Sequence, residues 1–444
     1  MIFSKLKNRD DTKAKVIKNV AWAVLGKIVN MLGVLLVGIL VARYLGPEQY
    51  GLMNYVISYV TLFTVIATFG LSNIEIRELS KCPEEKEKIL GTCFVIRLFF
   101  ATISYLLIVL VLFLTKVESY TAILILLYAS VLFTSCFEVI RNYFSSIIKN
   151  EYVVKSEIAR TFIGAVIKIF LLWQKAPLEY FVVATAFDTV LVASGYCLSY
   201  KSQVDSIFKW RFEKKYVLFY IKQAFPLVLS GAAVVVYQRI DQVMIGDMLN
   251  KTEVGYFATA GKFLDIVLFL PTVISQTVVP ILVKCRERSL EEYELKAKQF
   301  VSVVVWISVL LSIMVSLTAY WLIYLTYGMK YISAVPVLQI LAWKTVGMGL
   351  SSSGGQLIII EKIQKWAVIR NLAGCITCVG LNYLLIPKMG IIGSAWVTII
   401  TVFVSGCLAN VLIPPYRHIF RIEMYAIFKG WKHMLQLKTI LSRG

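Results

Sequence analysis

The chain has little charge and almost no histidine. Charged residues make up 16% of its 444 positions, and the two histidines, His418 and His433, both lie near the C-terminal end. Globular domains carry about 25% charged residues, whereas this chain is 59% hydrophobic. The composition excludes an ordinary soluble protein, and the scarcity of histidine argues against catalysis based on imidazole.

The cysteines offer no metal site. Cys375 and Cys378 form a single C-x-x-C pair, and neither a second pair nor a histidine lies nearby in the sequence. A structural zinc site takes four ligands, which usually come from two such pairs. We therefore expect no metal and no organic cofactor.

Long polar segments are also missing. Twelve apolar runs approach or exceed the roughly 20 residues that cross a bilayer. They cover residues 18–44, 50–72, 89–114, 119–141, 153–173, 179–199, 217–246, 254–283, 299–325, 333–360, 366–386 and 391–413. The connections between them are too short for a catalytic domain. We predict an all-α integral membrane protein with about twelve transmembrane helices, which is not an enzyme.

Acidic residues are outnumbered, with 26 Asp and Glu against 46 Lys and Arg. Most basic residues fall in alternate connections, including the N-terminal segment and residues 201–216. Basic loops stay in the cytoplasm, so both termini are predicted to be cytoplasmic. The net charge of +20 then reflects topology and contact with anionic lipid headgroups, and we expect no nucleic-acid partner. The first apolar run is too long for a signal peptide and lacks a cleavage site, which predicts that it is retained.

The chain repeats itself at an offset of 204 to 210 residues. Residues 45–51 (LGPEQYG) match residues 249–255 (LNKTEVG). Further along, Glu151, Arg160, Gly164 and Pro177 match Glu361, Arg370, Gly374 and Pro387. Each repeat holds six predicted helices, an even number, so both begin on the same side of the membrane. We predict two six-helix lobes related by a pseudo-twofold axis along the membrane normal, which is one plan of secondary transporters.

This repeat divides the chain into four predicted parts. They are an N-terminal lobe (1–200), a cytoplasmic linker (201–216), a C-terminal lobe (217–413) and a C-terminal tail (414–444). Apolar residues recur at helical spacing in the tail and alternate with lysines, which predicts a basic amphipathic helix on the cytoplasmic leaflet.

Several charged residues lie deep in the predicted helices, where each costs about 2.5–3.5 kcal/mol at the centre of the bilayer. The cations are Lys27, Arg97, Lys168, Lys222, Arg239, Lys262 and Lys344, and the anions are Asp188, Asp241 and Asp265. Lys222 can reach the interface by snorkelling. The other six cations still outnumber the anions, and we predict that they line a wet cavity between the lobes. Such a cavity suits a phosphate or pyrophosphate.

The three aspartates are candidates for coupling to H⁺ or Na⁺. Each of them could instead form an ion pair with a lysine. A static network of ion pairs therefore stays open as the alternative for the charges of the second lobe.

Four segments resemble the Wzx-like O-antigen and polysaccharide flippases of the multidrug/oligosaccharidyl-lipid/polysaccharide (MOP) exporter superfamily. They are VARYLGPEQYG (41–51), FGLSNIEIRE (69–78), QRIDQVMIG (238–246) and VGYFATAGK (254–262). The resemblance covers nearly the whole chain, and Arg239, Asp241 and Lys262 occupy positions of the family motifs.

The resemblance implies translocation of undecaprenyl-pyrophosphate-linked oligosaccharide repeat units, by alternating access and with an ion gradient. It also implies a place in the bacterial cytoplasmic membrane, with membrane lipids and the polysaccharide polymerase machinery as partners.

Three other functions would require different features of the sequence. A multidrug or cation antiporter of the same superfamily carries cationic substrates, which favour acidic rather than basic residues in the cavity. A peptidoglycan-precursor flippase has two more spans than we find. A membrane-embedded sugar polymerase needs a sizeable outer loop with acid–base residues, whereas the predicted outer loops, such as residues 175–179, are short.

Overall fold

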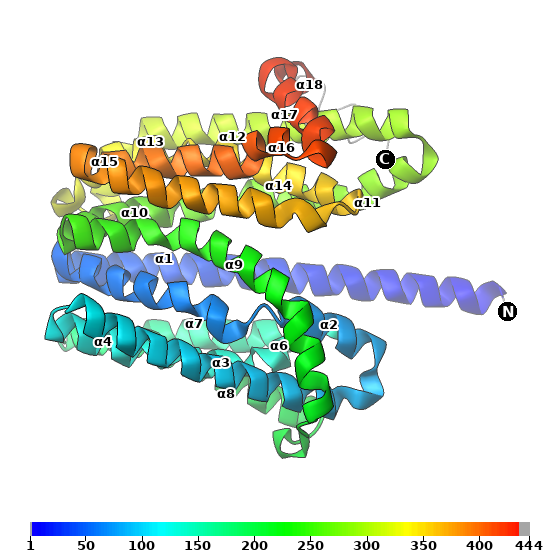
Figure 1. Cartoon of the computed structure of the whole chain (residues 1–444), viewed down its shortest axis with the longest axis horizontal. Helices are drawn as coiled ribbons and strands as arrows, with labels where there is room; N and C mark the ends of the chain where they lie inside the picture. Colours follow the sequence, from blue (N-terminus) through cyan, green and yellow to red (C-terminus); the bar gives the residue numbers. More distant parts are fainter. Residues whose placement is uncertain (1, 435–444) are drawn as a thin grey trace. The chain divides into compact units, whose positions relative to one another are not determined.

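The computed structural model describes residues 2–434, which are helical almost throughout and contain no strand (Figure 1). The longer helices are α1 (Ile2–Thr68), α3 (Lys86–Thr115), α7 (Asn150–Trp173), α8 (Leu178–Gln203), α9 (Lys214–Met248), α11 (Phe269–Arg288), α12 (Leu290–Thr326) and α15 (Ala367–Phe403). The shorter ones are α2 (Ser72–Lys81), α4 (Ser119–Ala129), α5 (Val131–Thr134), α6 (Glu138–Ser146), α10 (Lys251–Val267), α13 (Ala334–Leu341), α14 (Lys344–Ile360), α16 (Ala409–Leu412), α17 (Arg417–Lys429) and α18 (Trp431–Met434).

Nine stretches of the described chain are long and apolar enough to cross a membrane. In two of them a single labelled helix is divided at a glycine, at Gly46 in α1 (φ 75°, ψ 173°) and at Gly390 in α15 (φ 59°, ψ −145°). Positive φ values favour glycine, and Pro47 then occupies the first position of the next helix, where its missing N–H costs nothing. Each of these two stretches therefore counts as two spans, and α7, which is not among the nine, adds one more. The twelve predicted spans of an all-α membrane protein are thus confirmed.

The chain forms two compact units. Unit 1 contains the residues up to Leu45 together with Val56–Ala232, and unit 2 contains Gly46–Tyr55 together with the described residues from Ala233 onward. The division falls inside α9, later than the predicted linker at 201–216. The reason is that α9 is continuous, and its early residues Tyr220 and Ala224 are buried in the core of unit 1.

The predicted repeat has a direct counterpart inside unit 2. A Cβ atom on Gly51 would collide with the backbone of Lys251 and Gly255, and a Cβ atom on Gly255 would collide with the backbone of Pro47. At the offset of 204, Gly51 is equivalent to Gly255 and Pro47 to Lys251. The contact is therefore reciprocal, as expected of a twofold relation, and the helices approach to a distance that small residues allow.

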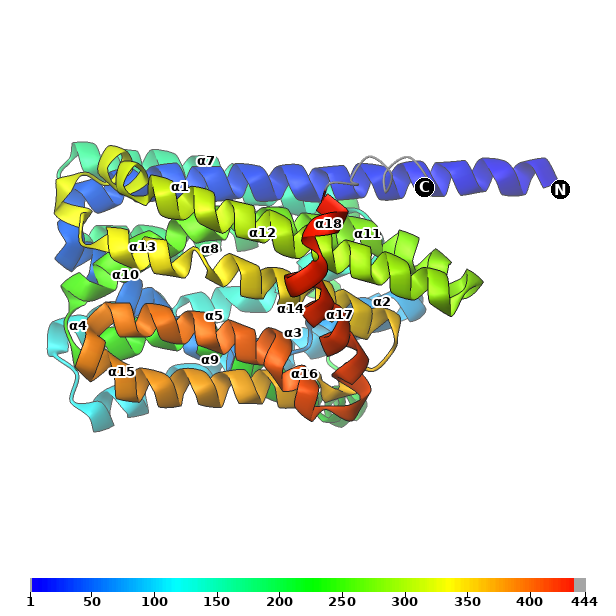
Figure 2. The same ribbon diagram turned by 90° about the horizontal axis from the view of Figure 1, so that it is seen from above.

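Helix α17, in the predicted tail, packs into unit 2. Its residues Ile419, Ile422 and Ala426 belong to the core of this unit, which also includes Val301 of α12 and Leu357 of α14. Figures 1 and 2 show α17 running across the bundle near α14 and α16. One face of the amphipathic helix is thus covered by protein, while Phe428 and other residues at its end are exposed.

Candidate functional site

Unit 2 contains a cavity of about 240 Å³ that is lined by helices α9, α10, α13, α14 and α15. Five charged residues line it, namely Arg239 and Asp241 of α9, Lys262 and Asp265 of α10, and Lys344 of α14. All five were predicted as site residues, and all the lining residues belong to unit 2. Three cations against two carboxylates leave the cavity with an excess of positive charge. We refer to this cavity as the unit 2 pocket.

Local sequence spacing brings these side chains to the pocket. On α10, Lys262 and Asp265 are three residues apart and therefore share a helical face. Lys344 is the first residue of α14, so its ammonium group lies at the positive end of the helix dipole. Among the described residues, neither Arg239 nor Lys344 forms an ion pair or a hydrogen bond. Both cations are therefore available to an anionic ligand.

Asp241 is held by polar groups rather than by a cation. Its side chain is buried, with 4% exposure. One carboxylate oxygen accepts hydrogen bonds from Asn382 Nδ2 (2.9 Å) and Cys378 Sγ (3.1 Å), and the other accepts from Thr398 Oγ1 (2.8 Å). In the part of the chain that the structure describes, no Lys or Arg forms an ion pair with Asp241. Its direct contacts are therefore dipoles, and Lys344 across the pocket acts on it electrostatically without forming an ion pair.

The sharp turn of α15 builds this environment. A straight helix would separate Asn382 from Thr398 by about 24 Å, yet both side chains donate to Asp241. The chain therefore doubles back at Gly390. Two further buried oxygens, Asn382 Oδ1 and Ser394 Oγ, have no hydrogen-bond partner among the described residues. Sequence reasoning did not find Asn382 or Thr398, because single polar residues in an apolar helix give no distinct signal.

In unit 1, two predicted site residues are paired with each other. Lys168 of α7 forms an ion pair with Asp188 of α8. Gly164 lies one turn before Lys168, and a Cβ atom there would collide with the Asp188 carboxylate. The glycine therefore makes room for the ion pair. This arrangement confirms the alternative in which an aspartate simply neutralises a lysine.

Helix α1 adds further polar groups to unit 1. It runs beside α7 (Figure 2), and Arg160 of α7 donates to Asn30 Oδ1 at 2.7 Å. Lys27 lies nearly one turn before Asn30 and is exposed. Asn30 of α1 therefore contacts a cationic residue of α7 within the same unit.

The repeat relates Asp188 to Thr398 and Lys168 to Cys378, at an offset of 210 residues. In unit 1 these two positions hold an ion pair. In unit 2 they hold a thiol and a hydroxyl that both donate to Asp241. A built-in ammonium group thus neutralises the aspartate of unit 1, whereas no ammonium group among the described residues is in ion-pair contact with the aspartate of unit 2.

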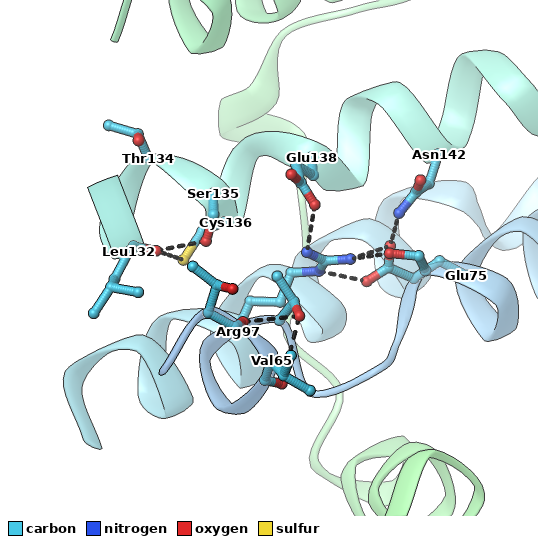
Figure 3. Close-up of polar contacts among 12 residues, drawn as sticks. Val65, Glu75, Arg97, Leu132, Thr134, Ser135, Cys136, Glu138 and Asn142 are labelled. Atoms are coloured by element: carbon cyan, nitrogen blue, oxygen red, sulfur yellow. Dashed lines mark hydrogen bonds and ion pairs between the residues drawn. The ribbon is translucent and has the colours of Figure 1, made fainter. Parts of the chain in front are cut away.

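Arg97 differs from its prediction as an anion-binding residue. It is fully buried, and its Nε and a terminal nitrogen donate to the two carboxylate oxygens of Glu75 at 2.8 and 3.0 Å (Figure 3). Glu138 Oε2 lies 3.4 Å from the guanidinium group, and Asn142 donates to Glu75. Arg97 is therefore part of a buried ion-pair cluster that joins α2, α3 and α6.

Glu75 was missed for a definite reason. We assigned residues 73–88 to a loop outside the membrane, whereas residues Ser72–Lys81 form α2 and pack on α3 and α6. The buried Ile74 and Leu79 of α2 carry Glu75 inward. These two apolar residues, which stand beside charged residues in the sequence, were the signal that could have predicted a partly buried helix here.

We expect Arg97→Met to destabilise the protein by about 3–5 kcal/mol, because removal of one partner leaves a buried charge without compensation. Thermal unfolding in detergent would measure this loss. The double variant Arg97→Met/Glu75→Leu should recover part of it, and Arg239→Met in the unit 2 pocket should change stability little. Equal destabilisation by Arg97→Met and Arg239→Met would contradict the assignment of Arg97 to a structural pair.

Comparisons with known proteins identify the family and the fold of the chain. A family model described as polysaccharide biosynthesis protein matches residues 16–286. Among solved structures, the fold is similar to the lipid II flippase MurJ in an inward closed conformation, with a TM-score of 0.68 and 15% identity over 95% of this chain and 93% of that one. No curated protein matches the sequence.

Two transporters of the MOP superfamily have the same fold. A multidrug resistance transporter of the MATE family, in an inward-facing conformation, gives a TM-score of 0.64 with 15% identity over 94% of this chain and 96% of that one. A transporter from Pyrococcus furiosus, described as having a binding pocket of reverse polarity, gives 0.54 with 12% identity and 95% coverage of both chains. These likenesses establish the fold, and the family model covers more than half of the sequence. The chain therefore belongs to the polysaccharide biosynthesis protein family and has the fold of the MOP superfamily, as its sequence motifs predicted.

Proposed function

We propose that this multi-pass membrane protein translocates an undecaprenyl-pyrophosphate-linked oligosaccharide repeat unit across the bacterial cytoplasmic membrane by alternating access. The observation that carries the proposal is the unit 2 pocket, in which Arg239, Lys262 and Lys344 face two carboxylates. Membership of a polysaccharide biosynthesis family supports a lipid-linked glycan as the substrate. The process needs no covalent chemistry and no cofactor.

The size of the unit 2 pocket suits part of this substrate. Sites for drug-sized ligands measure about 300–1,000 Å³, and the pocket measures about 240 Å³. It therefore matches a pyrophosphate or a single sugar rather than a whole oligosaccharide. Arg239 offers a planar guanidinium group that binds phosphate oxygens in pairs, and Lys262 and Lys344 add point charges. Lys27 of unit 1 stays a candidate for contacts with the rest of the head group, whereas Lys168 is engaged by Asp188.

A cation or multidrug antiporter is the second candidate function. The observation in its favour is the fold similarity to a multidrug transporter of the MATE family. The excess of cations in the unit 2 pocket opposes it, because a cationic substrate would be repelled. A sugar polymerase fits less well, because the predicted outer loops are too short to hold the acid–base residues that it needs.

Arg239→Ala should slow flipping at least tenfold, because the pocket loses its bidentate anion ligand. The assay uses proteoliposomes with a fluorescent undecaprenyl-pyrophosphate-oligosaccharide, and a membrane-impermeant reagent reports which leaflet holds the head group. Lys222→Ala is a matched control, because Lys222 is a deep cation of the same helix that does not line the pocket. Equal flipping by the wild type and Arg239→Ala would contradict the proposal, and export of a cationic dye without flipping would favour the antiporter.

We further propose that Asp241 binds the coupling ion, H⁺ or Na⁺. It is a buried carboxylate without an ion pair among the described residues. Asn382 Oδ1, which has no hydrogen-bond partner in the same part of the chain, lies on α15, the element that supplies the hydrogen-bond donors to Asp241. Asp188 suits this role less well, because Lys168 already neutralises it, and Asp265 is exposed in the pocket. A cation on Asp241 would raise the positive charge of the pocket, so ion and anion would bind cooperatively.

Asp241→Asn should uncouple flipping from the ion gradient, because the amide carries no charge for a cation to neutralise. Flipping in proteoliposomes would be compared with and without an imposed Na⁺ or pH gradient. We expect the gradient to accelerate the wild type and the control Asp265→Asn several-fold and to leave Asp241→Asn unaffected. A normal gradient response in Asp241→Asn would move the coupling site elsewhere.

We also propose that both termini are cytoplasmic, on the basis of the basic connections, and that membrane lipids and polysaccharide polymerase machinery are the partners. A reporter enzyme that is active only in the cytoplasm, fused to the C-terminus, should be active. Activity of a periplasmic reporter at the same position would reverse the topology.

A further inference from the structure

The helix that follows the last membrane span carries one fully buried acid. Glu423 of α17 has 0% exposure. Asn410 of α16 donates from Nδ2 to both of its carboxyl oxygens, at 3.1 and 3.0 Å. Gly354 of α14 makes room for the carboxyl group, because a Cβ atom at this position would collide with it. Three helices of unit 2 therefore meet at a single side chain.

An acceptor without a partner on the Asn410 amide suits a neutral acid at Glu423. Asn410 Oδ1 is buried and has no hydrogen-bond partner among the described residues. A protonated Glu423 has an O–H group that can donate to this oxygen while it accepts from Nδ2, as in an acid–amide pair. An ionised Glu423 is an acceptor only. It would leave Asn410 Oδ1 unsatisfied, at a cost comparable to a lost hydrogen bond.

The electrostatic surroundings agree with this reading. Burial raises the pKa of Glu423 to about 8, although hydrogen bonds from Asn410 and Cys407 and the positive charge of Arg370 act in the opposite direction. The Nε and one terminal nitrogen of Arg370 are buried and have no hydrogen-bond partner among the described residues. Arg370 is therefore a cation toward which an ionised Glu423 would be drawn, away from its contact with Asn410.

We propose that Glu423 is a proton-binding site that clasps α17 to α14 and α16, and that loss of its proton releases the clasp. On deprotonation the O–H bond breaks, the electron pair stays on the carboxylate and the proton goes to solvent. This site goes beyond the proposed transport function and does not depend on the identity of the substrate.

The clasp lies on the helices that line the unit 2 pocket. Lys344 and Met348, on the wall of the pocket, are in α14, which also holds Gly354. The helix with Thr398 and Val402 continues into a π-helical segment, η6 (Val404–Leu408), and then into α16. Segments of π-helix are frequent at functional sites. Release of α17 would therefore free the ends of two pocket-lining helices at once.

Other titratable groups around α17 are accounted for. His418 of α17 pairs with Glu361, at the end of α14, with 2.7 Å between Nε2 and Oε2, and this contact raises the pKa of His418. Lys298 of α12 lies 5.9 Å from the centre of the Tyr425 ring, and His433 of α18 is 3.2 Å from the Tyr425 hydroxyl. His418 is thus the second group whose titration can affect the docking of α17.

The sign of the effect follows from linkage. Burial raises the carboxyl pKa to about 8 when α17 is docked, whereas the carboxyl group has its usual pKa of 4.5 in water. The released state therefore binds fewer protons between these values. The contribution of Glu423 to docking is therefore fully present below pH 4.5 and is lost as the pH rises through 8. The slope approaches a tenfold change per pH unit within this window.

Hydrogen exchange of residues 417–429, in the full-length protein in lipid nanodiscs, tests the clasp. Between pH 5.5 and 7.5 the protection factor of the wild type, corrected for intrinsic exchange, should fall by up to about 100-fold. Glu423→Gln keeps a neutral, hydrogen-bonding side chain, and its protection should lose most of this pH dependence. His418→Gln is the matched control, and it should keep most of the pH dependence.

Two results would overturn the inference. One is a wild-type protection factor that does not change between pH 5.5 and 7.5. The other is an equal slope in the wild type and in Glu423→Gln. Infrared difference spectra provide a direct second readout, because the carbonyl band of a protonated carboxyl group should disappear above pH 8 in the wild type and be absent in Glu423→Gln. The same band in both proteins would assign the proton to another acid.

Discussion

A charge in hydrocarbon needs a counter-charge, water or a proton, and this requirement organises the polar features of the protein. Arg97 meets it with Glu75, and Lys168 meets it with Asp188. In our proposal Glu423, which is buried in the protein core after the last span, meets a similar requirement by holding a proton next to Asn410. The unit 2 pocket is different, because Arg239 and Lys344 lack ion-pair partners among the described residues and the hydrogen bonds to Asp241 come from uncharged groups. Charges that are left uncompensated mark where ligands bind.

The internal repeat places different residues at equivalent positions of the two units. At equivalent positions, unit 1 holds Lys168 and Asp188, whereas unit 2 holds Cys378 and Thr398. In the first pair a covalently attached ammonium group neutralises the aspartate. In the second, both side chains donate hydrogen bonds to Asp241, which forms no ion pair among the described residues. Duplication thus produced one neutralised site and one open site from the same scaffold. Gly51 and Gly255 preserve the twofold relation, because each permits the close approach of the other's segment.

The sequence predicted the features that repeat or extend over many residues. The membrane helices, the repeat and the five charged residues of the unit 2 pocket were all visible in it, because hydropathy, periodicity and charge are local signals. Glu75 and Asn382 were not visible, because their importance depends on contacts with residues far away in the chain. The division inside α9 was missed for a similar reason, since a basic linker signals topology and does not report which helices pack together. The tail was recognised as amphipathic, but only the structure shows which face Glu423 occupies.

The most direct test of the account is the binding of a short-chain prenyl pyrophosphate to the purified protein, measured by calorimetry at different Na⁺ concentrations and pH values. If the unit 2 pocket is an open anion site whose charge is set by the ion on Asp241, affinity should increase when Na⁺ is added or the pH is lowered. Reciprocal linkage requires the ligand to strengthen cation binding by the same factor. Binding that is independent of both ions, or that is unchanged in Arg239→Ala, would contradict the account.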